Sequence, residues 1–378
     1  MFWFIGAAPA KIGFYLENRK PASINSTVAV QWVVSIRDEL SKKVIGQSEA
    51  VRKISEYVDI YQGGLSLPDR PAGVFMFQGP TGVGKTYIVE ALASVLHRNH
   101  HTMIRIDCEE FQHDHEIAKL MGAPPGYIGY RESNGKGTTG RLAPEKLLEC
   151  TSEGCKLVLI LFDEIEKGAP TLFRILLQIM DKGTMTGGDN ITTNFENTMI
   201  FMTSNLGAAD IAKIKSGPSY GFQKASVRDI NQAATKALKK NFTPEFINRL
   251  DEIILFESLL PEEIKQIFYV EFDRLRWHVA KRKDGGVYLK LTGPAEQHLI
   301  EKGFDAEYGA RHLKRLLMRK ILAPLSRQLI AGELKPKSEL IVDFDGADLV
   351  FRTGRDPDSL EVLLEISIAG IKEKKKDK

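Results

Sequence analysis

Short apolar runs alternate with helix-like segments between residues 74 and 257. Five such runs are rich in β-branched or aromatic residues: 74–78, 103–107, 157–164, 198–205 and 252–257. Strands that are buried on both faces have this nearly continuous apolar character. When strands alternate with helices, the usual result is a parallel sheet with helices on both faces. The pattern therefore predicts one α/β domain with a five-stranded parallel sheet.

The pattern changes after Pro261 to a long amphipathic helix over residues 262–282. Further helical segments are predicted around 294–303 and 309–332, followed by the strand-like runs ELIVDF and DLVF. These features indicate a second, smaller and mainly helical α+β domain. We therefore divide the chain into an N-terminal segment (1–40), a large domain (41–257), a small C-terminal domain (258–353) and a tail (354–378).

Composition adds little about function. Lys plus Arg number 52 and Asp plus Glu 49, a balance that favours neither nucleic acid nor an acidic membrane as the main partner. The three cysteines are Cys108, Cys150 and Cys155, and the last two have no second pair to complete a zinc site. We expect reduced thiols and a cytoplasmic location.

Both ends of the chain have distinctive compositions. Residues 1–14 are apolar but lack a basic leader, and Lys11 interrupts the run well short of a membrane span. We interpret this segment as one that packs on a partner surface, with an uncleaved signal or an interfacial anchor as the alternatives. The last eight residues, IKEKKKDK, are typical of a solvated, disordered tail, with a binding role as the alternative.

The strongest chemical signal is GPTGVGKT, which fits G-x-x-x-x-G-K-[ST] between a predicted strand and a predicted helix. Glycines let backbone N–H groups turn inward around phosphate oxygens. The lysine brings a positive charge to the outer phosphates, the threonine offers a hydroxyl to Mg²⁺, and the helix N-terminus adds its positive end. We predict a nucleoside triphosphate site that contains Gly79, Pro80, Thr81, Gly82, Val83, Gly84, Lys85 and Thr86.

The run LVLILFDEIEK places two acidic residues at the end of a buried strand. Asp163 is predicted to hold Mg²⁺ together with Thr86. Glu164 is then the candidate base that orients and deprotonates the attacking water, because phosphoryl transfer depends mainly on positioning and charge stabilisation. The alternative, two acidic residues that merely keep the strand end soluble, does not explain the phosphate loop. The pair therefore favours hydrolysis of the nucleotide over its storage or sensing.

Together, the motifs VIGQ, GPTGVGKT, GAPPGYIGY, LFDEIEK, MTSN, FTPEFINRLDEII and YGAR resemble the second ATPase module of the ClpB-like disaggregases, within the Clp-type AAA+ unfoldases. The resemblance runs from about residue 43 to residue 315. It implies an AAA+ P-loop ATPase fold, a helical small domain and a six-membered homo-oligomeric ring with ATP between neighbours. It also implies unfolded or aggregated polypeptides as substrates.

The resemblance assigns further residues. Asn205 would hydrogen-bond the attacking water or the γ-phosphate, although an Asn at this position also suits a helix cap. Arg249 would act as an arginine finger in the neighbouring subunit, although it could simply pair with Asp251 or Glu252. Arg311 would contact the phosphates of its own subunit and couple nucleotide state to the angle between the domains. Val44 and Ile45 match the adenine pocket, with a generic core contact as the alternative.

Residues 122–130, GAPPGYIGY, set Tyr127 and Tyr130 among glycines and prolines. The resemblance implies that Tyr127 projects into a central channel and grips polypeptide of any sequence, while Tyr130 supports the loop. An aromatic ring suits such a role because it offers a large contact area at low entropic cost. From the residues alone, tyrosines folded back on the domain surface are the favoured interpretation.

Two departures from the family bear on function. Only about 40 residues precede the ATPase, so cooperation with a heat-shock chaperone partner, which depends on a coiled coil in the family, is in doubt. Residues 131–156 look longer than the family's equivalent, and we expect a surface loop there with a short helix behind it.

Three function classes remain: a stand-alone protein unfoldase or disaggregase, an ATPase that feeds a ClpP-type protease, and a nucleotide-switched scaffold. Residues 220–222, Tyr-Gly-Phe, resemble the tripeptide with which some family members dock that protease, although an aromatic turn packed on its own domain is the commoner use of such a triplet. The presence of Glu164, Asn205 and Arg249 argues against the scaffold, because a switch could dispense with hydrolytic residues.

Overall fold

The computed structural model describes residues 36–122, 140–188, 190–208, 227–282, 286–303, 310–334 and 338–353. Several sequence-based expectations fall outside these ranges. They concern the N-terminal apolar segment, the aromatic loop with Tyr127 and Tyr130, the triplet 220–222 and the lysine-rich tail.

The predicted five-stranded parallel sheet is confirmed. Its strand order is β2-β3-β6-β1-β7, and every neighbouring pair in it is parallel. The strands are β1 (Gly73–Gln78), β2 (Ile104–Asp107), β3 (Val158–Asp163), β6 (Thr198–Ser204) and β7 (Glu252–Leu255). Every residue of β1, β3 and β6 is buried, which explains their nearly continuous apolar sequences.

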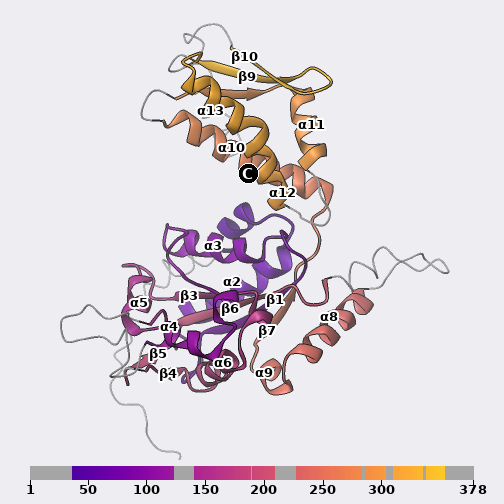
Figure 1. The fold of residues 1–378 in the computed structure, drawn as a ribbon. Coiled ribbons are helices and arrows are strands. Elements are labelled where there is room, and N and C mark those ends of the chain that lie inside the picture. Colours follow the sequence, from indigo (N-terminus) through magenta and orange to yellow (C-terminus); the bar gives the residue numbers. More distant parts are fainter. Residues whose placement is uncertain are drawn as a thin grey trace, which may run out of the picture.

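Helices cover both faces of this sheet (Figure 1). Alternate side chains of the strands point to opposite faces and enter two separate apolar clusters. One cluster includes α2 (Ser48–Gln62) and α3 (Lys85–Leu96), and the other includes α6 (Pro170–Lys182), α8 (Val227–Asn241) and α9 (Pro244–Asn248). Phe201 of β6 stacks on Phe75 of β1 with 5.1 Å between ring centres. The central strands are thus also joined by a side-chain contact on the face that α2 and α3 cover.

Short elements connect the strands. Residues Cys108–Phe111 and Asp114–Ile117 form 3-10 turns, which lead into α4 (Ala118–Met121). After residue 140 the chain forms α5 (Pro144–Glu149), which is the short helix expected in this region. A 3-10 turn, Ile165–Lys167, follows β3, and β4 (Thr184–Thr186) pairs with β5 (Thr192–Asn194) in a hairpin.

The second domain is small and mainly helical, as predicted. It contains α10 (Pro261–Ala280), α11 (Gly293–Gly303), α12 (Ala310–Leu317), a π-helical turn (Met318–Leu322) and α13 (Ala323–Ile330). Its sheet has three strands rather than the two expected, in the order β10-β9-β8. These are β8 (Tyr288–Leu291), β9 (Glu339–Phe344) and β10 (Leu349–Thr353). The strands and helices enclose a separate apolar core.

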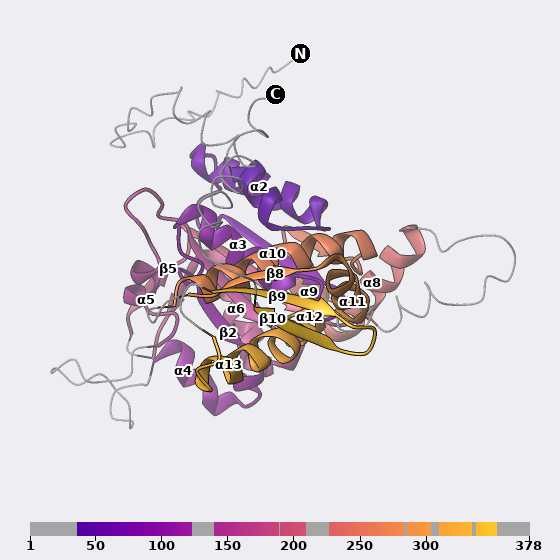
Figure 2. The same cartoon turned by 90° about the horizontal axis from the view of Figure 1, so that it is seen from above.

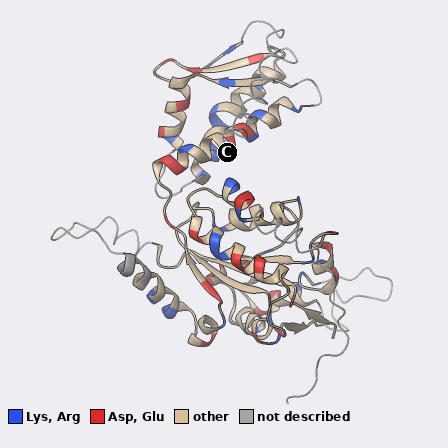
Figure 3. Ribbon diagram, turned by 180° about the vertical axis from the view of Figure 1, so that it is seen from behind, with Lys and Arg blue, Asp and Glu red and all other residues tan. Residues whose placement is uncertain are grey.

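The small domain lies above α3 in Figure 1, and from above it overlies the helices and strands of the large domain (Figure 2). A backbone hydrogen bond joins the two domains, because the N–H of Ala310 donates to the carbonyl of Gly82 at 3.2 Å. Lys and Arg are interspersed with Asp and Glu over both domains (Figure 3). None of the helices in the described ranges combines the length and the apolar character that a membrane crossing requires.

Candidate active site

The phosphate loop lies where the carboxyl ends of three adjacent strands meet. It connects β1 to α3, while Asp163 ends β3 and Asn205 follows β6. Ligands of open α/β sheets bind at this edge. Gly84 has φ +103° directly before α3, a left-handed conformation that favours glycine. The loop sequence therefore supplies the backbone geometry that a phosphate cradle requires.

Lys85 is buried beneath the loop, with 8% of its surface exposed. Its ammonium donates to the Pro80 carbonyl at 2.8 Å and to Asn205 Oδ1 at 2.6 Å, and it also donates to the Gly79 carbonyl. Burial lowers the pKa of Lys85 to about 8, and the carboxylates of Glu166 and Asp163 oppose that shift. The ammonium is thus held at the loop by carbonyl and amide oxygens that a phosphate could replace.

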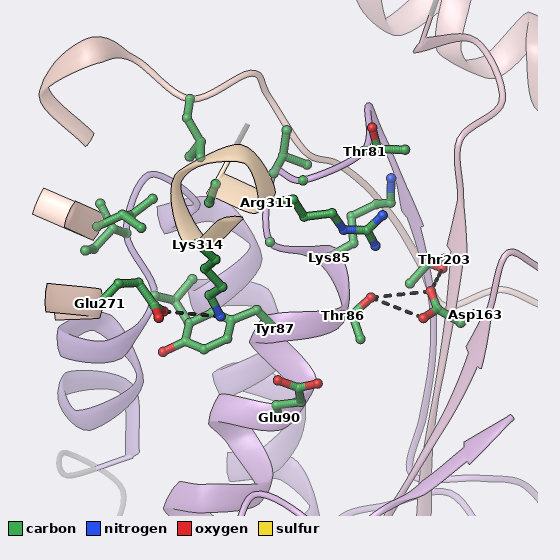
Figure 4. Close-up of a pocket in the computed structure, with 18 of the residues that line it drawn as sticks. Thr81, Lys85, Thr86, Tyr87, Glu90, Asp163, Thr203, Glu271, Arg311 and Lys314 are labelled. Atoms are coloured by element: carbon green, nitrogen blue, oxygen red, sulfur yellow. Dashed lines mark hydrogen bonds and ion pairs between the residues drawn. The ribbon is translucent and has the colours of Figure 1, made fainter. Parts of the chain in front are cut away.

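Asp163 is the centre of a polar network at the end of β3 (Figure 4). Thr86 Oγ1 lies 3.3 Å from Asp163 Oδ1, and Thr203 donates its hydroxyl to the same oxygen at 2.6 Å. Arg105 donates to Asp163 Oδ2 at 2.6 Å and lies 3.7 Å from Glu90. Asp163 thus faces the Thr86 hydroxyl with a carboxylate that three side chains orient.

Glu164 has a left-handed backbone, with φ 55° and ψ 53°, which is uncommon for a residue other than glycine. Its N–H donates to Thr203 Oγ1 at 3.0 Å, which holds the residue in this conformation. Its carboxylate accepts from Asn205 Nδ2 at 3.2 Å and pairs with Lys167 at 2.7 Å. Strained backbone of this kind concentrates at functional sites.

Asn205 links these groups. Its side-chain oxygen accepts from Lys85 and its side-chain nitrogen donates to Glu164, while its backbone N–H donates to Glu166 Oε1 at 2.9 Å. The side chain is therefore directed into the site, where it contacts Lys85 and Glu164 rather than capping a helix.

These residues border a cavity of about 260 Å³ between the two domains. Its lining includes the loop from Thr81 to Thr86 together with Asp163, Glu164 and Asn205. It also includes the apolar residues Val44, Ile45, Leu259, Ile267 and Val270. Gly79 and Pro80 do not line the cavity, and their carbonyls instead accept from Lys85. A cavity that offers both polar and apolar groups suits a nucleotide, because its phosphates and its base require different surroundings.

The two predicted arginines lie in different places. Arg311 of α12 lines the cavity, and Figure 4 shows its guanidinium close to Lys85. It makes no ion pair with any other residue whose side chain the structure describes. Arg249 follows α9 outside the cavity and pairs with Asp181 at 2.5 Å. The expected alternative, a pair with Asp251 or Glu252, is wrong, because Arg70 and Lys53 occupy those carboxylates.

Sequence reasoning missed several residues of the site. Thr203 lies two residues before Asn205 in TMIFMTSN, but the motif alone does not show which way its hydroxyl points. Arg105 lies on β2, and its contact with Asp163 follows from the pairing of β2 with β3. Tyr87, Glu271 and Lys314 meet only because the small domain packs against α3.

Two family models match the chain. One, described as an AAA domain of the Cdc48 subfamily, covers residues 70–253. The other, described as the C-terminal D2-small domain of ClpB protein, covers residues 259–342. The chain thus combines an AAA domain with a ClpB-type small domain, as expected for a ClpB-like C-terminal ATPase module. The resemblance stated from the motifs is therefore confirmed, and so is the AAA+ fold with its small C-terminal domain.

Curated ClpB chaperones give the same result. The chain is 39% identical over 320 residues to the chaperone protein ClpB of Meiothermus ruber, an alignment that spans 84% of this chain and 35% of the relative. It is also 39% identical over 330 residues to the ClpB of Rhodopseudomonas palustris, across 87% of this chain and 35% of the relative. The chain thus spans about a third of these relatives' length.

Among solved structures, the chain is similar to a cryo-EM reconstruction of Hsp104 in its closed state with ATPγS and FITC casein. The TM-score is 0.72 at 28% sequence identity, and the match covers 88% of this chain and 53% of that chain. The AAA+ fold thus extends over both domains described above.

Proposed function

We propose that this chain is an ATP-driven protein unfoldase or disaggregase that works as a homo-oligomeric ring, six-membered by the family's example. One observation carries the proposal: Lys85, Asp163, Glu164 and Asn205 converge on one cavity of a ClpB-type AAA+ fold. A site that only stored a nucleotide would not require a carboxylate such as that of Glu164 to activate an attacking water.

The residues suit Mg-ATP. Thr86 and Asp163 offer hard oxygen ligands 3.3 Å apart, and Mg²⁺ prefers such ligands alongside substrate phosphates. Within the described ranges, no cluster of three or more His, Cys, Asp or Glu side chains could hold a metal. An ion here would therefore depend on the phosphates, and when bound it would neutralise charge on them. In this proposal Lys85 holds the outer phosphates, while Val44 and Ile45 contact the adenine.

Glu164 and Asn205 perform the hydrolytic step. Asn205 orients the attacking water and the base, since its amide reaches both Lys85 and Glu164. Glu164 accepts the proton of that water as the bond to the γ-phosphorus forms and the bridging oxygen leaves. Arg311 stabilises the phosphates from the small domain. Arg249, half-exposed and paired only with Asp181 among described side chains, exchanges that partner for a phosphate of the neighbouring subunit.

The remaining parts of the proposal concern residues outside the described ranges. Tyr127 grips unfolded or aggregated polypeptide in the channel. Delivery to a ClpP-like protease through residues 220–222 stays an alternative, and a cytoplasmic location accompanies either activity. The alternatives differ in what they do to a folded substrate, so one experiment separates them.

The test uses the full chain with Mg-ATP and a folded fluorescent protein that carries an unstructured tail. We expect ATP hydrolysis, a particle of several subunits by light scattering, and loss of substrate fluorescence without cleavage. Degradation that appears only when a ClpP-like peptidase is added would favour the protease alternative. A chain that stays monomeric in saturating Mg-ATP and hydrolyses none of it would refute the proposal.

A further inference from the structure

Tyr87 follows Thr86 in the first turn of α3, and its ring faces the small domain (Figure 4). Arg274 of α10 donates from Nη2 to the Tyr87 hydroxyl at 2.7 Å. The guanidinium carbon of Arg274 also lies 5.5 Å from the ring centre. Arginine over an aromatic face makes a favourable cation–π contact within about 6 Å. One side chain of the phosphate-loop helix is therefore bound by the other domain in two ways.

A second cation from the small domain approaches the same ring. Lys314 Nζ of α12 lies 6.0 Å from the ring centre of Tyr87. Glu271 Oε1 accepts from Arg274 at 2.9 Å and lies 3.3 Å from Lys314 Nζ. Only 15% of the Glu271 side chain is exposed, so this carboxylate holds both cations in a partly desolvated place. We call Tyr87, Arg274, Glu271 and Lys314 the interdomain cluster.

The cluster is connected to the phosphate site at both of its ends. Tyr87 is bonded to Thr86, which faces Asp163. Lys314 lies three residues after Arg311 on α12, so the two side chains project from one face of that helix. The hydrogen bond from Ala310 to Gly82 holds the first turn of α12 against the phosphate loop. Contacts to Tyr87 therefore help to determine where Arg311 lies.

We propose that Tyr87 is a positioning residue that joins the two domains through Arg274 and Lys314, and thereby keeps Arg311 at the phosphate end of the cavity. This inference rests on the proposed ATPase. Tyr87 acts through Arg311 and needs no contact with the reacting phosphate. Its loss should lower the rate of hydrolysis more than it lowers the affinity for nucleotide, because the phosphate loop itself is unchanged.

The experiment compares the full-length chain with Tyr87→Ala, Tyr87→Phe and Arg274→Ala. The matched control is Arg276→Ala, which removes an exposed arginine of the same helix that pairs with Asp273 of that helix. Three quantities are measured: kcat for ATP, the Kd of a fluorescent ADP analogue, and amide hydrogen exchange of residues 310–317 without nucleotide. The exchange measurement needs no catalytic activity.

Tyr87→Ala should accelerate exchange in residues 310–317 about tenfold, because α12 loses its anchor. It should lower kcat about tenfold while Kd changes less than about threefold. Arg274→Ala should produce the same pattern from the other side of the contact. Tyr87→Phe, which keeps the ring and loses the hydroxyl, should fall between Tyr87→Ala and the unmodified chain. Arg276→Ala should match the unmodified chain.

Unchanged exchange and kcat in both Tyr87→Ala and Arg274→Ala would overturn the inference. A Kd weakened beyond about thirtyfold with unchanged exchange would also overturn it, because the ring would then be a nucleotide contact. If the unmodified chain hydrolyses no ATP, the proposed function fails. The exchange data would still decide whether Tyr87 anchors α12.

Discussion

Thr203 lies at the end of β6 with 1% of its surface exposed, and its hydroxyl joins the two acidic residues of the site. It donates to Asp163 Oδ1 at 2.6 Å and accepts from the Glu164 N–H at 3.0 Å. Thr203→Val keeps the shape of the side chain and removes both hydrogen bonds. We expect this change to lower both the stability of the large domain and the rate of ATP hydrolysis.

The magnitude follows from the two bonds. A hydrogen bond to a charged group contributes about 1.5–3 kcal/mol, and a buried N–H left unpaired costs about 1–3 kcal/mol. Because valine fills the same space, no cavity adds to the loss. We therefore expect Thr203→Val to lower the free energy of unfolding by about 2.5–6 kcal/mol. Thr203→Ser keeps the hydroxyl and loses one methyl group, so its loss should be about 1 kcal/mol.

Urea unfolding of the nucleotide-free chain measures the stability, and steady-state ATP turnover measures the effect on the site. Thr203→Val should also hydrolyse ATP about tenfold more slowly, since Asp163 and Glu164 lose a common support. Thr203→Ser should recover most of the rate. If Thr203→Val is as stable as the unmodified chain and turns over ATP equally fast, the hydroxyl does not organise the acidic pair.

Four further changes test the proposed roles. Lys85→Ala should weaken ATP binding at least tenfold, because the phosphates lose a buried charge, and an unchanged Kd would contradict the phosphate assignment. Glu164→Gln should bind ATP normally and lose at least a hundredfold in turnover, as single-turnover kinetics would measure; undiminished hydrolysis excludes Glu164 as the base. Arg249→Ala should slow turnover only in the assembled particle. A fully active variant ring would show that Arg249 only pairs with Asp181 and does not act on the neighbouring site. Tyr127→Ala should hydrolyse ATP within about twofold of the normal rate yet fail to unfold the fluorescent substrate. Normal unfolding by this variant would contradict a role of Tyr127 in holding substrate.

The sequence predicted the central sheet well, because β1, β3 and β6 are buried on both faces and leave long apolar runs. It also predicted the phosphate loop, whose glycines are required by backbone conformation. It missed β8, a four-residue strand whose sequence YLKL alternates apolar and polar residues less clearly. Such a short strand gains its stability from pairing with β9, and that pairing is a long-range contact.

The parts of the site that were missed depend on geometry that no single motif contains. The contact of Arg105 with Asp163 requires the register in which Asp107 of β2 pairs with Asp163 of β3. The interdomain cluster requires a definite orientation of the small domain, which no local pattern specifies. Arg249 illustrates the same limit, since its partner Asp181 lies on α6, far from it in sequence.

The π-helical turn Met318–Leu322 lets α12 run into α13 without a break, even though Pro324 lies at the start of α13. Residues 310–330 thus form one continuous helical arm of roughly 30 Å, at a rise of about 1.5 Å per residue. One end of this arm carries Arg311, and the other ends at Ile330, which is 88% exposed. A tilt of about 5° at the phosphates would swing the outer end by roughly 3 Å. Spectroscopic labels attached near Ile330 would therefore report a tilt of this helical segment with the greatest sensitivity.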